Sequence, residues 1–285
     1  MWPKPPTLLD LPLEIANQIL EKMEPMDRLT ARKVCRSLKT AVDEFGIHFD
    51  KISINFCTNC VLLDLDGTRI EYTENDVYSK DLEIILDEAL ELEIFNTEYT
   101  PAHVKSFLEI LKLKKRVNVK KIDLKNFLFT DILSIISYMN AQVIEYIKMQ
   151  YVGSVDQFER LTCLDQWKNA HYCIIVDSEL ENVPIEDFFH FKEFEVESRS
   201  FSTQNAIEIR NDLLKRSSFQ SCTIWFHGGN SNEIAKVFQP DYDGDNEYEL
   251  DYITGDNAKF EIRCGIGLFV EEFCANQWEF VVQRC

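Results

Sequence analysis

The stretch LLDLPLEIANQILEKMEPMDRLTARKVCRSLKTAV, residues 8–42, decides the fold of the N-terminal part of this chain. Apolar side chains recur at helical spacing over residues 15–23 and again over residues 34–45. Pro25 ends the first helix, and Asp27 is expected to cap the next one. The apolar faces are too large for so short a segment to bury alone. A surface of this kind usually marks a partner; the alternative is a helical hairpin packed on the rest of its own chain.

The residues of this stretch resemble a known module. The run LPLEI…IL, then P-MD-R, then RKVCRSLKTAVD resembles an F-box, by which substrate receptors attach to Skp1 in cullin-based ubiquitin ligases. The continuation EFGIHFDKISINF is similar to the nematode F-box A family, in which an FTH domain follows the F-box. The resemblance to FTH extends over roughly residues 80–230. Many F-boxes carry Trp at the position of Leu38, so the packing near the end of the last helix is expected to differ.

The resemblance implies which residues contact Skp1. A set of apolar side chains would form the Skp1-facing surface or the packing beneath it: Leu11, Pro12, Ile15, Ile19, Leu20, Leu29 and Val34. Arg28, Arg32 and Arg36 recur at every fourth position, so we expect them on one helix face. That face is either a solvated surface or complementary to an acidic partner, as Skp1 is in the families this chain resembles. On the second interpretation, Arg28 and Arg32 join the Skp1-binding set.

Composition narrows the class of protein. A chain of 285 residues can hold a small module and one larger domain. A net charge of −19 argues against nucleic acid and anionic membranes as partners, because both carry phosphate. Nine cysteines, scattered and odd in number, indicate a reduced cytoplasmic or nuclear protein. No apolar stretch approaches the ~20 residues that span a bilayer, and Met1–Pro6 does not resemble a signal peptide.

Beyond residue 50, short runs in which apolar and polar residues alternate are separated by capped amphipathic helices. The alternation predicts that each run is a strand with one buried face. The strand runs are KISINF (51–56), LELEIF (90–95), KKIDLKN (120–126), VIEYIKM (143–149), HYCIIVD (171–177), FKEFEVE (191–197) and CTIWFH (222–227). A two-strand unit recurs at a roughly constant interval. This favours an irregular leucine-rich-repeat-like α/β solenoid after the three-helix F-box, with a conventional α/β sandwich as the alternative.

The C-terminal segment differs from the repeats. Residues 249–265 contain two alternating runs around TGDN, which predicts a β-hairpin, and QWEFVVQ (277–283) predicts a further strand. We expect this part to cap the end of the solenoid and protect its edge. Three domains result: an F-box-like helical module (1–50), an FTH-like α/β substrate-recognition domain (51–230) and an acidic β-rich C-terminal cap (231–285).

One motif suggests an enzyme. VLLDLDGT, residues 61–68, matches the nucleophile motif of haloacid-dehalogenase-type phosphatases, with Asp64 attacking phosphorus and Asp66 as acid/base. The alternative is a hairpin, since Asp66-Gly67 favours a type I′ turn and the next five residues alternate. The hairpin is expected, because a helical module stands upstream where such a phosphatase has its opening strand.

Three further patterns are weaker. Cys57 and Cys60 have the spacing of a zinc knuckle, but no second Cys/His pair stands nearby. The acidic run from Asp241 imitates a calcium loop, with Asn246 in place of Gly and Tyr252 in place of the bidentate Glu. We therefore expect no metal and no cofactor. A basic cluster over residues 105–125 is either a binding patch, for example for RNA, or a solvated helix end, and the helix end is expected.

Taken with the resemblance, these patterns indicate an adaptor that is not itself an enzyme. The helices would bind a Skp1-like adaptor and, through it, a cullin, while the solenoid would hold an unidentified protein substrate. A separate enzyme would transfer ubiquitin, and the adaptor would contribute only by holding the substrate close to that enzyme. One alternative is an interaction scaffold outside any ligase, and another is a phosphatase that uses Asp64.

Overall fold

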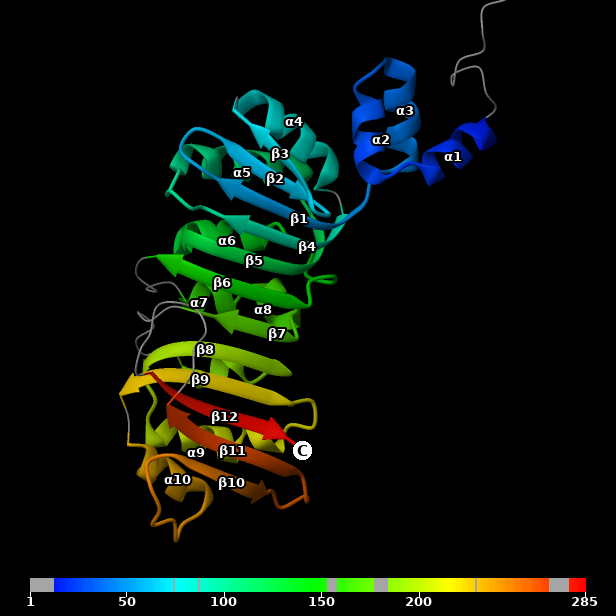
Figure 1. The fold of residues 1–285 in the computed structure, drawn as a ribbon. Helices are drawn as coiled ribbons and strands as arrows, with labels where there is room; N and C mark the ends of the chain where they lie inside the picture. Colours follow the sequence, from blue (N-terminus) through cyan, green and yellow to red (C-terminus); the bar gives the residue numbers. More distant parts are fainter. Residues whose placement is uncertain are drawn as a thin grey trace, which may run out of the picture. The chain divides into compact units, whose positions relative to one another are not determined.

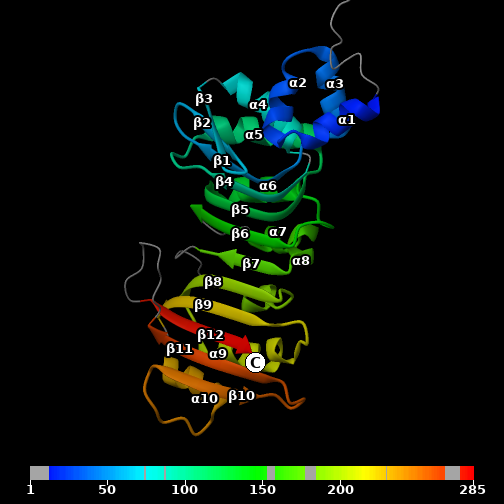
Figure 2. The same cartoon turned by 45° about the vertical axis from the view of Figure 1, so that its right-hand side comes forward.

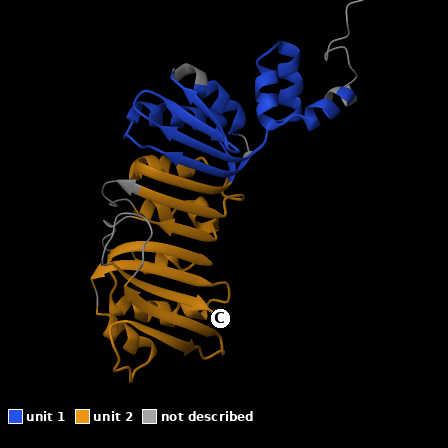
Figure 3. Cartoon of the chain, viewed as in Figure 1, with its two compact units in different colours: residues 1–119 blue, residues 120–285 orange. Residues whose placement is uncertain are grey.

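The computed structural model describes residues 13–73, 75–86, 88–152, 158–176, 184–228, 230–266 and 277–285 (Figure 1). The chain divides into two compact units, residues 1–119 and 120–285 (Figure 3). Both units are mixed α/β, and the chain begins with a helical region, as the sequence predicted. The leucine-rich-repeat-like solenoid and the three domain boundaries stay predictions.

The first unit begins with three short helices, α1 (Leu13–Lys22), α2 (Pro25–Arg32) and α3 (Arg36–Phe45). Pro25 ends α1 and is the first residue of α2, where its missing N–H costs nothing. Glu24 therefore occupies the N-cap position, and the prediction that Asp27 is the cap is wrong. Arg36 begins α3 instead of continuing α2. The prediction that it shares one helix face with Arg28 and Arg32 is also wrong, because residues 33–35 separate the two helices.

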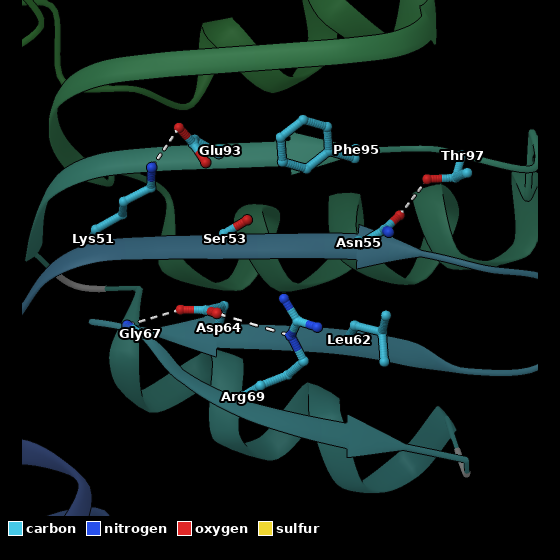
Figure 4. Close-up of a pocket in the computed structure, with 10 residues that line it drawn as sticks. All are labelled: Lys51, Ser53, Asn55, Leu62, Asp64, Gly67, Arg69, Glu93, Phe95 and Thr97. Carbon is cyan, nitrogen blue, oxygen red and sulfur yellow. Dashed lines mark hydrogen bonds and ion pairs between the residues drawn. The ribbon is translucent and has the colours of Figure 1, made fainter.

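A sheet follows within the same unit. Its strands lie in the order β4 (Glu88–Phe95), β1 (Phe49–Phe56), β2 (Val61–Leu65) and β3 (Thr68–Tyr72). β1 runs parallel to β4 and antiparallel to β2, which pairs with β3 as a hairpin. Alternate side chains such as Ile52, Ile54 and Phe56 are buried on the face that carries α4 (Asn75–Ile85) and α5 (Pro101–Lys114). The opposite face has no helix over it among the described residues (Figure 4).

The turn of the hairpin depends on two residues in the left-handed region. Asp66 has φ 50° and Gly67 has φ 87°, as a type I′ turn requires. Leu65 pairs with Thr68, and the register continues to Val61 and Tyr72. The hairpin predicted for residues 61–72 is therefore confirmed.

Gly67→Val is expected to lower the free energy of unfolding by about 1–2 kcal/mol, because a β-branched residue is strained at positive φ. An added Cβ would meet no atom within 4 Å, so the cost is conformational and not steric. Urea denaturation measures it. Gly255→Val is the control, since Gly255 also has open space around it but no positive φ. Equal losses in the two variants would contradict this account of the turn.

The second unit contains a larger sheet (Figure 2). Its strands lie in the order β5 (Asn118–Leu128), β6 (Tyr146–Val152), β7 (Tyr172–Ile175), β8 (Glu193–Ser200), β9 (Ser221–Gly228), β12 (Trp278–Arg284), β11 (Lys259–Ile266) and β10 (Tyr248–Ile253). Neighbours from β5 to β9 are parallel, and those from β9 to β10 are antiparallel. The strands predicted by alternation are confirmed, with shifted ends.

Helical segments lie on one face of this sheet (Figures 1 and 2), and those that precede β9 in the chain connect the parallel strands. They are α6 (Phe129–Ser137), α7 (Phe158–Thr162), α8 (Asp165–Asn169), the 3₁₀ segment η2 (Ile185–Phe188), α9 (Thr203–Asn211), the 3₁₀ segment η3 (Leu213–Lys215) and α10 (Ser231–Phe238). Ser202 is the N-cap of α9 and forms a capping box with Asn205. The core lies between these segments and the sheet.

The C-terminal strands form as predicted but extend the sheet in a particular way. β12 pairs with β9, and the β10–β11 hairpin then pairs with β12 through β11. β10 is therefore the last strand in the order, and its exposed side chains include Glu249 and Asp251. Charged side chains on an outer strand oppose pairing with another chain.

Candidate interaction surfaces

The three N-terminal helices bury a small apolar core of their own. Leu20 and Val42 are 0% exposed and Leu29 is 1% exposed. Ile19 is half-buried beside them in α1. Leu20 and Leu29 are therefore core residues of the helical module, and their place in a Skp1-binding set stays a prediction. Leu11 and Pro12 lie outside the described residues.

Two residues of the predicted set are exposed. Val34 lies in the turn between α2 and α3 and is 71% exposed, and Ile15 in α1 is 41% exposed. The Val34 backbone N–H donates to the Ala31 carbonyl at 3.1 Å, which fixes the turn. An apolar side chain held this far into solvent contributes little to the stability of its own chain, since it removes little surface from water.

The two predicted arginines hold the helices together. Arg28 donates to the carbonyl oxygens of Leu20 at 2.7 Å and Glu21 at 3.3 Å, which lie at the C-terminal end of α1. Its guanidinium also lies 4.7 Å from the centre of the Phe45 ring. A cation at this end of a helix is favourable because the last carbonyls lack partners.

Arg32 joins α2 to α3. Its guanidinium forms a two-point ion pair with the Asp43 carboxylate, with Nη2 and Oδ2 3.2 Å apart. The Arg32 side chain is 17% exposed. Both arginines are thus engaged inside the helical module, which the sequence did not indicate.

A second unpredicted contact joins the helices to the sheet of the first unit. Asp81 in α4 is 3% exposed and accepts hydrogen bonds from Lys33 Nζ and from the Tyr72 hydroxyl, both at 2.6 Å. Burial, and then the hydrogen bond to Asp81, raise the pKa of Tyr72 well above its usual range. Lys33 lies 48 positions from Asp81, so no local sequence pattern could have predicted this contact.

The two carboxylates of the phosphatase-like motif stabilise the hairpin. Asp64 Oδ1 accepts from the Gly67 backbone N–H at 2.9 Å, and its other oxygen lies 4.0 Å from Arg69 Nε. Asp66 accepts from the backbone N–H groups of Lys51 at 2.7 Å and Asp50 at 3.3 Å. Both side chains thus have structural partners in a turn, and this arrangement does not favour a phosphatase.

The open face of the first sheet is hollowed (Figure 4). The cavity measures about 610 Å³ and has the small side chain of Ser53 between larger neighbours. Ser53 pairs in register with Asp64 of β2 and Glu93 of β4. Lys51 forms an ion pair with Glu93 at 2.8 Å, so the cations of this cavity are balanced by its anions. A mixed polar and apolar surface of this kind can bind a polypeptide, but it does not select one charge.

The weaker motifs form ordinary structure. Cys57 and Cys60 flank the β1–β2 turn, where the Cys57 N–H donates to the Cys60 carbonyl at 3.0 Å. The calcium-like run continues into β10, and Tyr252 pairs there with Phe260. No group of three or more His, Cys, Asp or Glu side chains placed to hold a metal ion occurs in the described part of the chain.

The basic cluster is split between two elements. Lys112 and Lys114 lie in the last turn of α5, as expected for a helix end. Further lysines of the cluster belong to β5, so the interpretation of the whole cluster as one helix end is wrong. They are Lys120, Lys121 and Lys125.

Comparison with known proteins agrees with this architecture. The F-box domain model matches residues 8–50, and the FTH domain model matches residues 101–241. The chain is also 24% identical to F-box A protein 224 of Caenorhabditis elegans over 302 residues. That alignment covers 91% of this chain and 77% of the relative.

The helical module and the matches define an F-box protein in which an FTH domain follows the F-box. The chain carries an F-box and an FTH domain in the order of the F-box A family, and it is similar to an F-box A protein along most of its length, as the sequence predicted. The F-box indicates an adaptor role of the general SCF type, in which F-box domains bind Skp1. Among the described residues, no helix is both long and apolar enough to cross a membrane.

Proposed function

We propose that this protein is the substrate-recognition adaptor of a Skp1–cullin–F-box ubiquitin ligase. The F-box would bind a Skp1-like adaptor and through it a cullin, and the remaining chain would bind a protein substrate. Such an adaptor is not an enzyme, and it accelerates transfer by holding the substrate close to a separate ligase. The observation that carries the proposal is the exposed apolar turn at Val34 within the residues that match an F-box.

The proposed Skp1 surface has an exposed part and a supporting part. Ile15 and Val34 are the exposed apolar side chains, and the sequence adds Leu11 and Pro12. The supporting side chains are Ile19, Leu20 and Leu29. Interfaces depend on a few apolar anchors that become buried on binding. Val34 is therefore our choice for an anchor.

Arg28 and Arg32 contribute to this surface by holding the helices in place. Arg28 binds the end of α1, and Arg32 binds Asp43 of α3. The α2–α3 turn that carries Val34 begins directly after Arg32. Charge reversal at either arginine would thus disturb the arrangement of the helices first, and electrostatic attraction to Skp1 second.

The proposed substrate-binding region is the FTH-like domain, residues 51–230, with the segment 231–285 as its cap. Each unit has one face of its sheet covered by helical segments (Figure 1), and the alternate side chains on the opposite face are a mixture of polar and apolar residues. Strand–helix repetition with parallel pairing from β5 to β9 supports the proposed irregular solenoid. Solenoids present such extended faces to other proteins. Because the chain has many free cysteines, we place the proposed adaptor in the cytoplasm or the nucleus, where thiols stay reduced.

Val34→Asp is expected to weaken Skp1 binding about tenfold to a hundredfold, because burying a valine at an interface is worth about 1.5–3 kcal/mol. Calorimetric titration of the full chain measures the affinity. The matched control is Leu113→Asp, because Leu113 in α5 is 70% exposed, nearly as much as Val34, but lies outside the F-box match. Both variants should keep the parent melting temperature.

Equal affinity of the Val34→Asp variant and the parent would contradict the proposed anchor. A scaffold that works outside any ligase predicts a different result, namely no Skp1 binding by the parent at all.

A further inference from the structure

A second cavity lies in the second unit, between η2, α9 and the ends of β8 and β9. Its volume is about 380 Å³, within the range of small-ligand sites. Phe188, Val196, Phe201 and Ile224 form its apolar walls, and each is at most 3% exposed. Buried side chains of the core of the unit therefore line the cavity.

The charged groups of this cavity are all of one sign. Glu186 of η2 is exposed and Glu208 of α9 is half-buried, and both line it. The described lining contains no Lys, Arg or His. The negative charge of Glu186 also acts on its neighbour Asp187, whose pKa is raised first by burial and then by Glu186. Two carboxylates with no cation among the described lining residues favour a positively charged ligand.

The other polar side chains of the lining are neutral, namely Ser198, Ser200, Ser202 and Asn205. Ser202 Oγ accepts from the Asn205 backbone N–H at 3.2 Å, and the Asn205 side-chain oxygen accepts from the Ser202 N–H at 3.0 Å. The capping box thus occupies amide groups that would otherwise attract an anion at the start of α9. Glu208 Oε1 accepts from Gln204 at 2.8 Å, and a carboxylate has further acceptor sites for other donors.

We propose that this cavity binds a basic side chain, arginine or lysine, of the protein substrate. The inference rests on the proposed adaptor function and specifies its substrate class. Long basic side chains have an apolar stem and a charged end, which match the apolar walls and the two carboxylates. Arginine fits best because its planar guanidinium carries five N–H donors in a fixed fork that matches carboxylate acceptors.

The test uses the full chain and two labelled peptides, Gly-Gly-Arg-Gly-Gly and the same peptide with citrulline, which is similar in shape but uncharged. Saturation-transfer NMR measures binding. The arginine peptide should bind and the citrulline peptide should not. The double variant Glu186→Gln with Glu208→Gln should bind the arginine peptide with roughly tenfold lower affinity, because hydrogen bonds between charged groups are strong. The matched control, Glu249→Gln with Asp251→Asn on β10, removes the same charge and should bind as the parent does.

Equal binding of the two peptides by the parent chain would overturn the proposal without any variant. Unchanged binding by the Glu186/Glu208 variant would overturn it too, as would tighter binding of a phosphoserine peptide. Skp1 binding is measured on the same preparations. A chain that binds the arginine peptide but not Skp1 contradicts the adaptor function alone, and the reverse result contradicts the cavity alone.

Discussion

Trp167→Ala is expected to lower the free energy of unfolding by about 3–5 kcal/mol, the largest effect of any substitution considered for this chain. Trp167 is 1% exposed, and its ring centre lies 5.6 Å from those of Phe158 and Phe188 and 4.9 Å from that of Phe191. Its indole N–H also donates to the Asp187 carbonyl at 3.3 Å. Truncation therefore leaves a cavity among aromatic rings and removes one hydrogen bond to the Asp187 carbonyl.

Urea denaturation followed by circular dichroism measures this loss. Ile253→Ala is the control in the same unit, because Ile253 is 58% exposed and should cost no more than about 0.5 kcal/mol. A Trp167→Ala variant as stable as the Ile253→Ala variant would show that α7, α8 and η2 do not pack as described.

Asp81→Ala is expected to lower the free energy of unfolding by about 2–3 kcal/mol. Most of this comes from the Tyr72 hydroxyl, which would lose its buried acceptor. The Lys33 side chain is 51% exposed, so its ion pair with Asp81 is screened by water and adds little. Asp81→Asn keeps an acceptor for Tyr72, so it should lower the free energy of unfolding distinctly less. Lys33→Met should lower it by less than about 1 kcal/mol. Chemical denaturation of the three variants measures the order.

If Lys33→Met lowered the free energy of unfolding as much as Asp81→Ala does, the ion pair would be the dominant contribution. Loss of Skp1 binding in the Asp81→Ala variant at a temperature where it remains folded would show that α4 helps to position the helical module.

Much of the secondary structure was predictable because it depends on local patterns. The run KISINF alternates along the chain, and β1 buries alternate residues accordingly. Asp66 and Gly67 specify the turn because both adopt positive φ. Ser202 specifies the start of α9 because its hydroxyl accepts from the Asn205 N–H. Each of these features is determined by residues within a few positions.

The surface was less predictable because burial depends on distant residues. Leu20 and Val34 both fit the same apolar helical pattern, yet one is fully buried and the other 71% exposed. Arg28 and Arg32 appeared as a charged stripe, but their partners lie on other helices. The acidic cavity combines Glu186 with Glu208, which lie in separate elements, and no spacing rule connects them.

The central claim is that the N-terminal helices bind Skp1, and titration of the full chain with a purified Skp1-type adaptor in a calorimeter tests it most directly. The account predicts a one-to-one complex with a Kd of about 1 μM or lower, as expected for an interface of standard size. It also predicts a negative heat-capacity change, because apolar side chains such as Val34 become buried. No binding at about 100 μM adaptor, from a chain that still melts cooperatively, would contradict the account.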